Sequence, residues 1–475
     1  MYEFSLNTNR GIIMFKKIAV FMVIIPAALL FSYVPAKAAT PFGDIVATSA
    51  LLAEADTGSI LFEENMGLQH PADALAKIMT LLLAVSAVDN EEIRLDELVE
   101  MTESAWFDIN ANSSTQNIKP GETMSFLDLL YCAYTGGANE ACNLIAERVD
   151  GDVETFVERM NVYAVSLGCT NTNFTNTHGQ YNNEQFTTAQ DQFLIFRDAM
   201  GKELFAEIAG AYRYNTISSD ESDERSLVSS NTLLNANGKY YYRFCTAGMV
   251  SATYEGGYSL VSFAESDGLS LISIVLGSDV IILEDESAEM RNLTESRRLF
   301  EWGFSEFSWR TILNSFGIVD KAPIINGAGA DFVNLCPETE IRLLLDKDIP
   351  DEEFVRNITI YSVDNGETLQ APVEAGTILG ELTLTRNNID YGTVNLVANT
   401  TIELHRLEFV RMQIAEVLSS STTRTVIVAL SVLVVLYTAL VIRYNIIRRK
   451  RLRRISEAKR KIIEERQQSD TSDFE

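Results

Sequence analysis

The chain has 475 residues and carries 66 acidic against 38 basic side chains, which gives a formal net charge of −28. This excess of negative charge excludes nucleic acid as a partner, because the phosphates would be repelled. The length allows two or three domains, since single hydrophobic cores rarely exceed about 250–300 residues.

The first 38 residues have the features of a secretion signal. Two lysines precede an apolar run from Ile18 to Val34, and a small-x-small cleavage pattern follows at Ala36-Lys37-Ala38. We therefore predict a signal peptide over residues 1–38, with an uncleaved anchor as the alternative. Met14 lies just before the lysines and is an alternative to Met1 as the start of translation.

Residues 39–307 are predicted to form an α/β domain. Strand patterns occur at Ile45–Glu54, Ser59–Glu63, Tyr258–Ala264 and Leu269–Leu276. Helix patterns occur at Leu75–Val88, Phe126–Cys132, Glu140–Val149 and Phe156–Leu167. Because the helices come before and between the strands, we expect a mostly antiparallel sheet with helices packed against it.

Residues 317–405 have a different composition, with short strand patterns interrupted by Gly, Pro, Asn and Asp. These patterns are Glu340–Leu345, Ile358–Val363, Ile378–Leu384 and Thr393–Val397. They predict a small all-β domain. Apolar residues then recur at helical spacing in residues 406–424, which predicts an amphipathic helix that lies on the outer membrane surface or forms a stalk.

Residues 425–442 form a second apolar run, without any charged side chain. At about 1.5 Å per residue this run spans roughly 27 Å, enough to cross the hydrocarbon core of a bilayer. Residues 443–475 contain 11 Lys and Arg against 6 Asp and Glu. Positive residues stay on the cytoplasmic side, so we predict a single-pass transmembrane helix with a cytoplasmic tail and the bulk of the chain outside. We expect the basic tail from Arg443 to Arg466 to be a solvated stop-transfer segment, with a helix lying on anionic lipid or a contact for a cytoplasmic partner as the alternatives.

Short motifs follow one another in a distinctive order between residues 44 and 405. They include Lys77-Ile78-Met79-Thr80, Gly137-Ala138-Asn139-Glu140-Ala141, His178-Gly179, Ser230-Asn231-Thr232 and Ala371-Pro372-Val373. Together they resemble the peptidase S11 D-alanyl-D-alanine carboxypeptidases, which are low-molecular-mass penicillin-binding proteins. The resemblance implies a penicillin-binding-protein/β-lactamase-like transpeptidase fold, followed by the small all-β domain of that family. It also implies a place at the cell wall, with peptidoglycan stem peptides as the substrate class.

The resemblance implies three catalytic motifs, and the first two are altered here. In the Ser-x-x-Lys motif the lysine takes the proton of the serine nucleophile. Lys77 is retained, but Ala74 occupies the nucleophile position and has no oxygen to activate. In the second motif Gly137 replaces a residue with a hydroxyl group, while Asn139 is retained.

The third motif, Lys-Thr/Ser-Gly on an edge strand, presents positive charge to the terminal carboxylate of the substrate in the resembled family. Counting back from Gly257-Tyr258 places Met249 at the lysine position. A register shifted by one residue places Val250 there instead, so neither register contains a lysine.

Other nucleophiles have weaker support. Asp73 lies four residues before Lys77, and we expect the two to form an ion pair on one helix face, with an acyl-aspartate as the alternative. Ser113 and Ser114 have no base assigned to them. We expect Cys245 to be a buried structural thiol.

These replacements predict a catalytically inactive pseudoenzyme, anchored in the membrane, that binds stem peptides or a wall-synthesis protein. One alternative is an active D-Ala-D-Ala carboxypeptidase with a displaced nucleophile, and another is a structural spacer or docking protein. No metal or other cofactor is predicted, because the five cysteines lack a CxxC pair and only three histidines are present.

Overall fold

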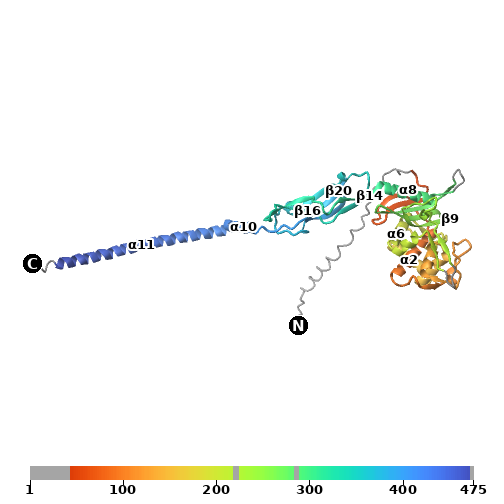
Figure 1. The fold of residues 1–475 in the computed structure, drawn as a ribbon, viewed down its shortest axis with the longest axis horizontal. Helices are drawn as coiled ribbons and strands as arrows, with labels where there is room; N and C mark the ends of the chain where they lie inside the picture. The colour runs from red at the N-terminus through yellow and green to blue at the C-terminus, as the bar shows by residue number, and fades with distance from the viewer. Residues whose placement is uncertain (1–42, 218–223, 283–287, 471–475) are drawn as a thin grey trace, which may run out of the picture. The chain divides into compact units, whose positions relative to one another are not determined.

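The structure is a computed structural model that describes residues 43–217, 224–282 and 288–470 (Figure 1). The predicted signal peptide and both candidate start methionines lie outside these residues. The chain divides into two compact units. The first comprises the described residues up to Arg310 together with Leu344–Ile349, and the second comprises Thr311–Leu343 and the residues from Pro350 onward.

The first unit is built on a five-stranded sheet in the order β2–β1–β11–β10–β9, with every neighbouring pair antiparallel. The strands are β1 (Ser49–Glu54), β2 (Ile60–Glu64), β9 (Cys245–Thr253), β10 (Gly257–Ser266) and β11 (Leu269–Ser278). The predicted antiparallel sheet is therefore confirmed. Strand β9 lies at one edge of this sheet.

Seven α-helices are described in this unit, on both faces of the sheet (Figure 1). They are α2 (Ala76–Asp89), α3 (Phe126–Tyr134), α4 (Asn139–Asp150), α5 (Val153–Ser166), α6 (Ala189–Met200), α7 (Glu203–Gly210) and α8 (Arg291–Glu306). The side chains of Ser125, Asp152 and Thr188 cap α3, α5 and α6 by accepting a backbone N–H from the first turn.

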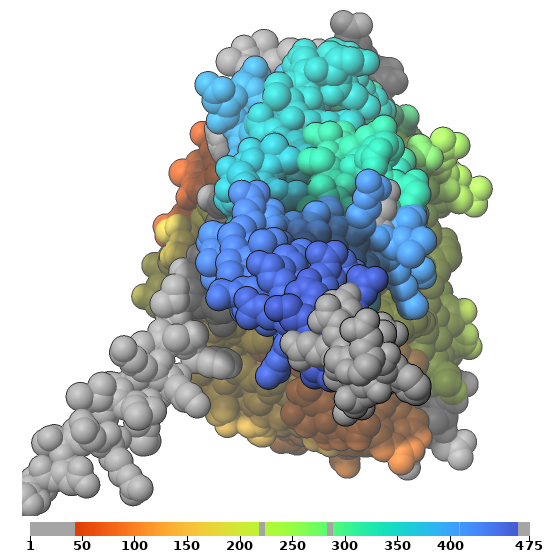
Figure 2. All heavy atoms as spheres, turned by 90° about the vertical axis from the view of Figure 1, so that its left-hand side faces the viewer, coloured from red at the N-terminus to blue at the C-terminus, as the bar shows by residue number. Residues whose placement is uncertain are grey.

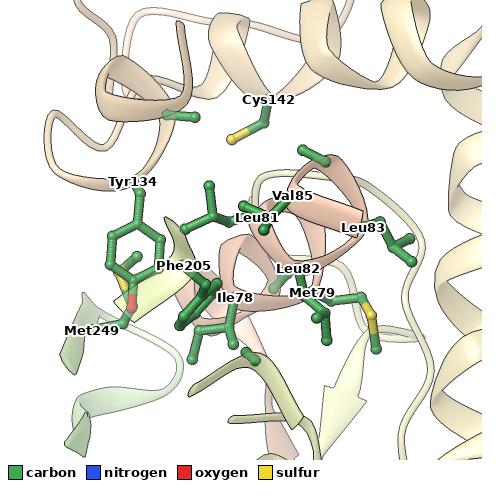
Figure 3. Close-up of a cluster of buried hydrophobic side chains, with 14 of the residues drawn as sticks. Ile78, Met79, Leu81, Leu82, Leu83, Val85, Tyr134, Cys142, Phe205 and Met249 are labelled. Atoms are coloured by element: carbon green, nitrogen blue, oxygen red, sulfur yellow. The ribbon is translucent and has the colours of Figure 1, made fainter. Parts of the chain in front are cut away.

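Two apolar clusters sandwich the sheet. Because successive side chains of a strand point to opposite faces, Leu51 and Ala53 of β1 pack with α2, whereas Ala50 and Leu52 pack on the face that α8 covers. In α2, 11 of the 14 residues are buried, which explains its nearly unbroken apolar sequence. Figure 3 shows these α2 side chains packed among neighbouring elements. Burial of each large apolar side chain contributes roughly 1.5–3 kcal/mol.

Short elements complete the first unit. Two-residue and three-residue strands pair as β3 (His70–Pro71) with β6 (Phe186–Thr187), β4 (Leu98–Glu100) with β5 (Thr123–Ser125), β7 (Arg213–Asn215) with β8 (Ser226–Val228), and β12 (Val280–Ile282) with β13 (Ala288–Met290). Three single 3₁₀ turns are η1 (Asp73–Leu75), η2 (Ser104–Trp106) and η3 (Thr232–Leu234). Of these, η1 leads directly into α2 and positions the candidate site.

The second unit contains a six-stranded sheet in the order β18–β20–β21–β16–β15–β19. Its strands are β15 (Asp320–Ile325), β16 (Phe332–Pro337), β18 (Val355–Ile360), β19 (Leu369–Gln370), β20 (Ile378–Arg386) and β21 (Ile389–Ala398). A turn η4 (Asp351–Glu353) precedes β18, and a separate two-stranded sheet joins β14 (Phe307–Leu313) to β17 (Ile341–Asp346).

One predicted strand of this β-rich part is partly wrong. The predicted strand Ile358–Val363 ends at Ile360, and a short helix α9 (Tyr361–Asp364) follows. The reason is local, since the Asp364 carboxylate accepts the backbone N–H of Ile360 and closes a turn.

Two helices follow the second sheet. The helix α10 (Arg406–Ser419) contains most of the predicted amphipathic segment, and α11 (Ser421–Asp470) begins after one intervening residue. The Ser420 hydroxyl accepts the backbone N–H of Thr423 and thereby caps α11. In α11 the segment from residue 421 to residue 463 is long and apolar enough to cross a membrane. The side chains of this segment are exposed except that of Thr423, which is half-buried, and Figure 2 views the helix end-on.

Candidate functional site

Four of the five predicted site residues lie on elements that meet at the start of α2. Ala74 is in η1, Lys77 is in the first turn of α2, and Asn139 is the first residue of α4. Met249 lies in the edge strand β9, which packs against η1. Gly137 lies two residues before α4 in a left-handed backbone conformation, with φ of 69°.

Lys77 is buried and held by two oxygen acceptors. Its Nζ donates to Asn139 Oδ1 at 2.8 Å and to the carbonyl oxygen of His178. Burial lowers the pKa of Lys77, because the charged ammonium loses its hydration. The lysine therefore keeps an environment that suits a general base, and the two retained residues of the first two motifs are in direct contact.

Asp73 does not pair with Lys77, so the predicted ion pair is wrong. The backbone of Asp73 is left-handed, with φ of 44°, and the residue belongs to η1 rather than to α2. Its side chain is directed to β9, where Thr253 Oγ1 donates to Asp73 Oδ2 at 2.6 Å. Burial raises the pKa of Asp73, while the hydrogen bond from Thr253 opposes that effect.

Alternate residues of β9 face η1 and α2. Met249 is buried in the core on the α2 side, and Figure 3 places it beside Phe205 and Tyr134. Two residues further along the strand, Ser251 Oγ accepts the backbone N–H of Ala74 at 3.2 Å. At the predicted lysine position the side chain thus fills the core, and the polar contact to Ala74 comes from Ser251.

A hydroxyl group lies beside the altered second motif. A Cβ atom added at Gly137 would lie 3.1 Å from Ser114 Oγ. The backbone carbonyl of Ser114 also accepts the N–H of Asn139 at 2.9 Å. Ser114 has no predicted role, because it lies 23 positions before Gly137 in the sequence and only the fold brings the two residues together.

Behind Lys77 lies a His–Asp pair that the sequence analysis did not identify. His178 Nε2 is 2.9 Å from Asp108 Oδ2, and the backbone N–H of Gln180 donates to His178 Nδ1 at 3.1 Å. His178 therefore donates through Nε2–H and is a neutral tautomer. Burial lowers the pKa of His178, although the Asp108 carboxylate acts in the opposite direction. The carbonyl that accepts from Lys77 belongs to the same histidine.

The cysteines provide no thiolate at this site. All five are buried and free. Burial raises the pKa of Cys142 and of Cys245 to about 12, so both thiols stay protonated near neutral pH. The predicted buried thiol at Cys245 is confirmed.

One acidic group in the described residues has the spacing of a cation site. Carboxylate oxygens of Glu306, Asp346 and Asp348 lie within 4.8 Å of one another. Such acidic groups also occur on protein surfaces without an ion, and this group lies outside the elements that carry the predicted site. The predicted lack of a metal stays a prediction.

Comparison with known proteins identifies the family. The family model of the D-alanyl-D-alanine carboxypeptidases, peptidase S11, matches residues 35–280. The chain belongs to this family. The S11 chain is 30% identical over 326 residues to the carboxypeptidase DacC of Escherichia coli K12, which covers 64% of this chain and 75% of DacC. It is 25% identical over 341 residues to DacF of Bacillus subtilis strain 168, which covers 72% of this chain and 82% of DacF.

Solved structures show the same fold as this S11 chain. Penicillin-binding protein 5 of Haemophilus influenzae matches with a TM-score of 0.57 and 23% identity, over 77% of this chain and 99% of its own. The peptidoglycan synthesis regulatory factor PBP3 of Streptococcus pneumoniae matches with a TM-score of 0.57 and 22% identity, over 76% of this chain and 100% of its own. The predicted penicillin-binding-protein fold and family are confirmed.

Proposed function

We propose that this S11 homologue does not release D-alanine and instead acts by binding. The observation that supports this proposal most is the methyl side chain of Ala74 at the predicted nucleophile position. It lies three residues before Lys77, whose buried amine donates a hydrogen bond to Asn139. Loss of the nucleophile in a serine hydrolase lowers kcat by on the order of 10⁶. Within the described residues Lys77 Nζ donates to Asn139 and His178, whereas the Ser251 and Thr253 hydroxyls bond to Ala74 and Asp73. Neither hydroxyl is therefore paired with that base.

A stem peptide or a wall-synthesis protein is the proposed ligand. Asn139 supports peptide binding, because its Oδ1 is occupied by Lys77 while its amide nitrogen makes no hydrogen bond within the described residues. A free side-chain N–H₂ at that position is able to donate to a peptide carbonyl. The S11 relatives named above are carboxypeptidases, which makes D-Ala-D-Ala peptides the first ligands to test.

A test of catalysis uses the full chain in detergent. Fluorescent penicillin and an acyl-D-Ala-D-Ala peptide are added to the natural protein and to an Ala74→Ser variant, and adducts are read by intact mass. We expect no penicillin adduct and no D-alanine release from the natural protein. An adduct on the natural protein would contradict the proposal, and peptide mapping would then identify the displaced nucleophile of the active-enzyme alternative.

We further propose that the binding domain faces the cell wall and that the tail is cytoplasmic. The basic residues after the apolar part of α11 support this orientation. A Ser456→Cys variant tests it, since the five native thiols are buried and react slowly with a maleimide. Labelling of intact cells by a membrane-impermeant maleimide would contradict the orientation, whereas labelling only after permeabilisation supports it.

A further inference from the structure

The turn η1 and the end of β9 are in direct contact at Asp73 and Ala74. We call this contact the seam and define it by Asp73, Ala74, Ser251 and Thr253. Asp73 and Ser251 are only 3% and 2% exposed. The seam joins residues about 180 positions apart in the sequence, and it occupies the backbone N–H of Ala74.

The first bond of the seam is an oriented hydroxyl that donates to a carboxylate. The backbone N–H of Gly256 donates to Thr253 Oγ1 at 2.9 Å, and Thr253 Oγ1 donates in turn to Asp73 Oδ2 at 2.6 Å. Because the hydroxyl oxygen accepts from Gly256, its proton is directed to the carboxylate. The short distance is typical of a charge-assisted hydrogen bond.

The second bond of the seam occupies the backbone of residue 74. Ser251 Oγ accepts the N–H of Ala74 at 3.2 Å. That N–H is at the start of α2, where backbone donors are otherwise free to bind an incoming group. A ligand that needs this donor must first displace Ser251.

Two glycines allow the chain to close tightly around Asp73. A Cβ atom at Gly179 would overlap the backbone carbonyl of Asp73, and a Cβ atom at Gly256 would overlap Asp73 Oδ2. Asp73 is therefore enclosed by two loops as well as by β9.

Among the described residues, the buried carboxylate of Asp73 makes no ion pair with a lysine or an arginine. Asp73 Oδ1 has no hydrogen-bond partner among the described residues, and the nearby lysine bonds to other oxygens. The charged or titratable groups that act on Asp73 are His70 and Glu255. Burial of a carboxylate with one unbonded oxygen costs free energy. Displacement of Asp73 therefore costs less than displacement of a carboxylate whose two oxygens are both bonded.

We propose that Asp73 is an intramolecular plug that takes the place of a ligand carboxylate at the end of β9. A peptide with a free C-terminal carboxylate binds by displacing the Asp73 side chain from Thr253, which also frees the N–H of Ala74. This inference rests on the proposed binding function and identifies what regulates access to that site.

The experiment compares the full natural chain with an Asp73→Gly variant, since glycine adopts the left-handed backbone of residue 73 without strain. The probe is diacetyl-L-Lys-D-Ala-D-Ala, and its affinity is measured by calorimetry. Removal of the plug is expected to tighten binding about tenfold, which corresponds to the loss of one charge-assisted hydrogen bond. The same peptide with a C-terminal amide is expected to show no gain. An unchanged affinity, binding by neither protein, or an equal gain with the amide would overturn the proposal.

Two further variants guard against an effect of altered folding. Asp267→Gly makes the same replacement at another left-handed aspartate, with φ of 51°, in the exposed turn between β10 and β11, and its affinity should equal that of the natural chain. Asp73→Asn keeps the side-chain size and removes the charge. Hydrogen exchange at the Ala74 amide should be faster in Asp73→Gly and in Asp73→Asn than in the natural chain. Equal exchange rates in all proteins would also overturn the plug.

The two proposals fail separately. Release of D-alanine by the natural chain would contradict the lack of catalysis and would leave the effect of Asp73→Gly on affinity to decide the plug. An inactive natural chain whose affinity is unaffected by Asp73→Gly would contradict the plug alone.

Discussion

The start of α2 and the rest of the helix differ in the kind of residues they contain. From Ile78 to Ala87 the helix is mostly apolar and most of its side chains are buried against neighbouring elements. At its start, Ala74 replaces the predicted nucleophile, and Asp73 bonds across to β9. A fold depends on apolar volume and pattern, and many different residues can supply both. Catalysis, in contrast, depends on particular atoms at particular positions.

Lys77 lies at the border between these two regions. Its side chain is buried like those of the apolar residues that follow it, yet its Nζ donates a hydrogen bond to Asn139, the other predicted motif residue. We interpret its retention as structural, because removal of the amine would leave two buried acceptors without a donor. The following predictions test the contrast between the apolar body and the polar start of α2.

The largest effect is expected in the apolar body. Leu82→Ala removes a fully buried side chain and should lower the free energy of unfolding by about 2–5 kcal/mol. Urea unfolding followed by tryptophan fluorescence measures this, since all three tryptophans lie between residues 106 and 309. Leu98→Ala is the control, at 70% exposure. Equal losses in both variants would contradict the contrast.

Thr253→Val should have a smaller effect, at the seam. The variant keeps the side-chain shape and removes the donor to Asp73 Oδ2, which should cost about 1–3 kcal/mol because a buried carboxylate loses its partner. Thr246→Val on the exposed side of β9 is the matched control and should change stability by less than about 0.5 kcal/mol. A Thr253→Val protein as stable as the control would show that the seam bond contributes nothing.

Lys77→Met should change how stability depends on pH. Burial lowers the pKa of Lys77 below 10.5, so between the lowered value and 10.5 the unfolded chain binds more protons than the folded chain. Stability therefore rises with pH across that window, by at most about 1.4 kcal/mol per pH unit, and the methionine variant should lack this rise. Melting temperatures measured from neutral to alkaline pH give the slopes. Parallel slopes for the two proteins would refute the assignment to Lys77.

Asp73→Asn should have the smallest effect, with the opposite sign. Burial raises the pKa of Asp73 above 3.8, so between 3.8 and the raised value the folded chain binds more protons than the unfolded chain. The contribution of Asp73 is fully present below pH 3.8 and is lost as pH rises through its folded pKa. Melting curves from acidic to neutral pH should show a shallower fall in the asparagine variant. An identical fall in both proteins would exclude Asp73 as its source.

Much of the scaffold could be predicted from sequence, because its signals are local. The periodic and continuous apolar runs indicated the strands β1, β10 and β11 and the helix α2, with borders wrong by only a few residues at most elements. The prediction that the catalytic motifs are altered also came from the sequence alone, because it depends only on which residue occupies each predicted motif position. A helix was one of the alternatives for the basic tail, and α11 does continue as a helix through it to Asp470.

The arrangement at the start of α2 could not be predicted. Sequence spacing suggested that Asp73 shares a helix face with Lys77, but η1 ends the regular α-helical geometry one residue before Ala76 and turns Asp73 away. The partners of Asp73 and Ala74 lie on β9, far along the chain. Pairings of this kind depend on how the sheet edge meets the helix, and no local pattern encodes them.

By itself, the sequence determined the family, the antiparallel α/β scaffold, the apolar helix that can cross a membrane and the alanine at the predicted nucleophile position. These follow from residue identity and from periodicity, which act over a few neighbouring positions. Only the tertiary structure decided that Met249 packs in the core, that Lys77 donates to Asn139 and that Asp73 accepts from Thr253. The reason is that hydrogen bonds and burial join atoms that are close in space, and the folded chain alone brings residues 73 and 253 together.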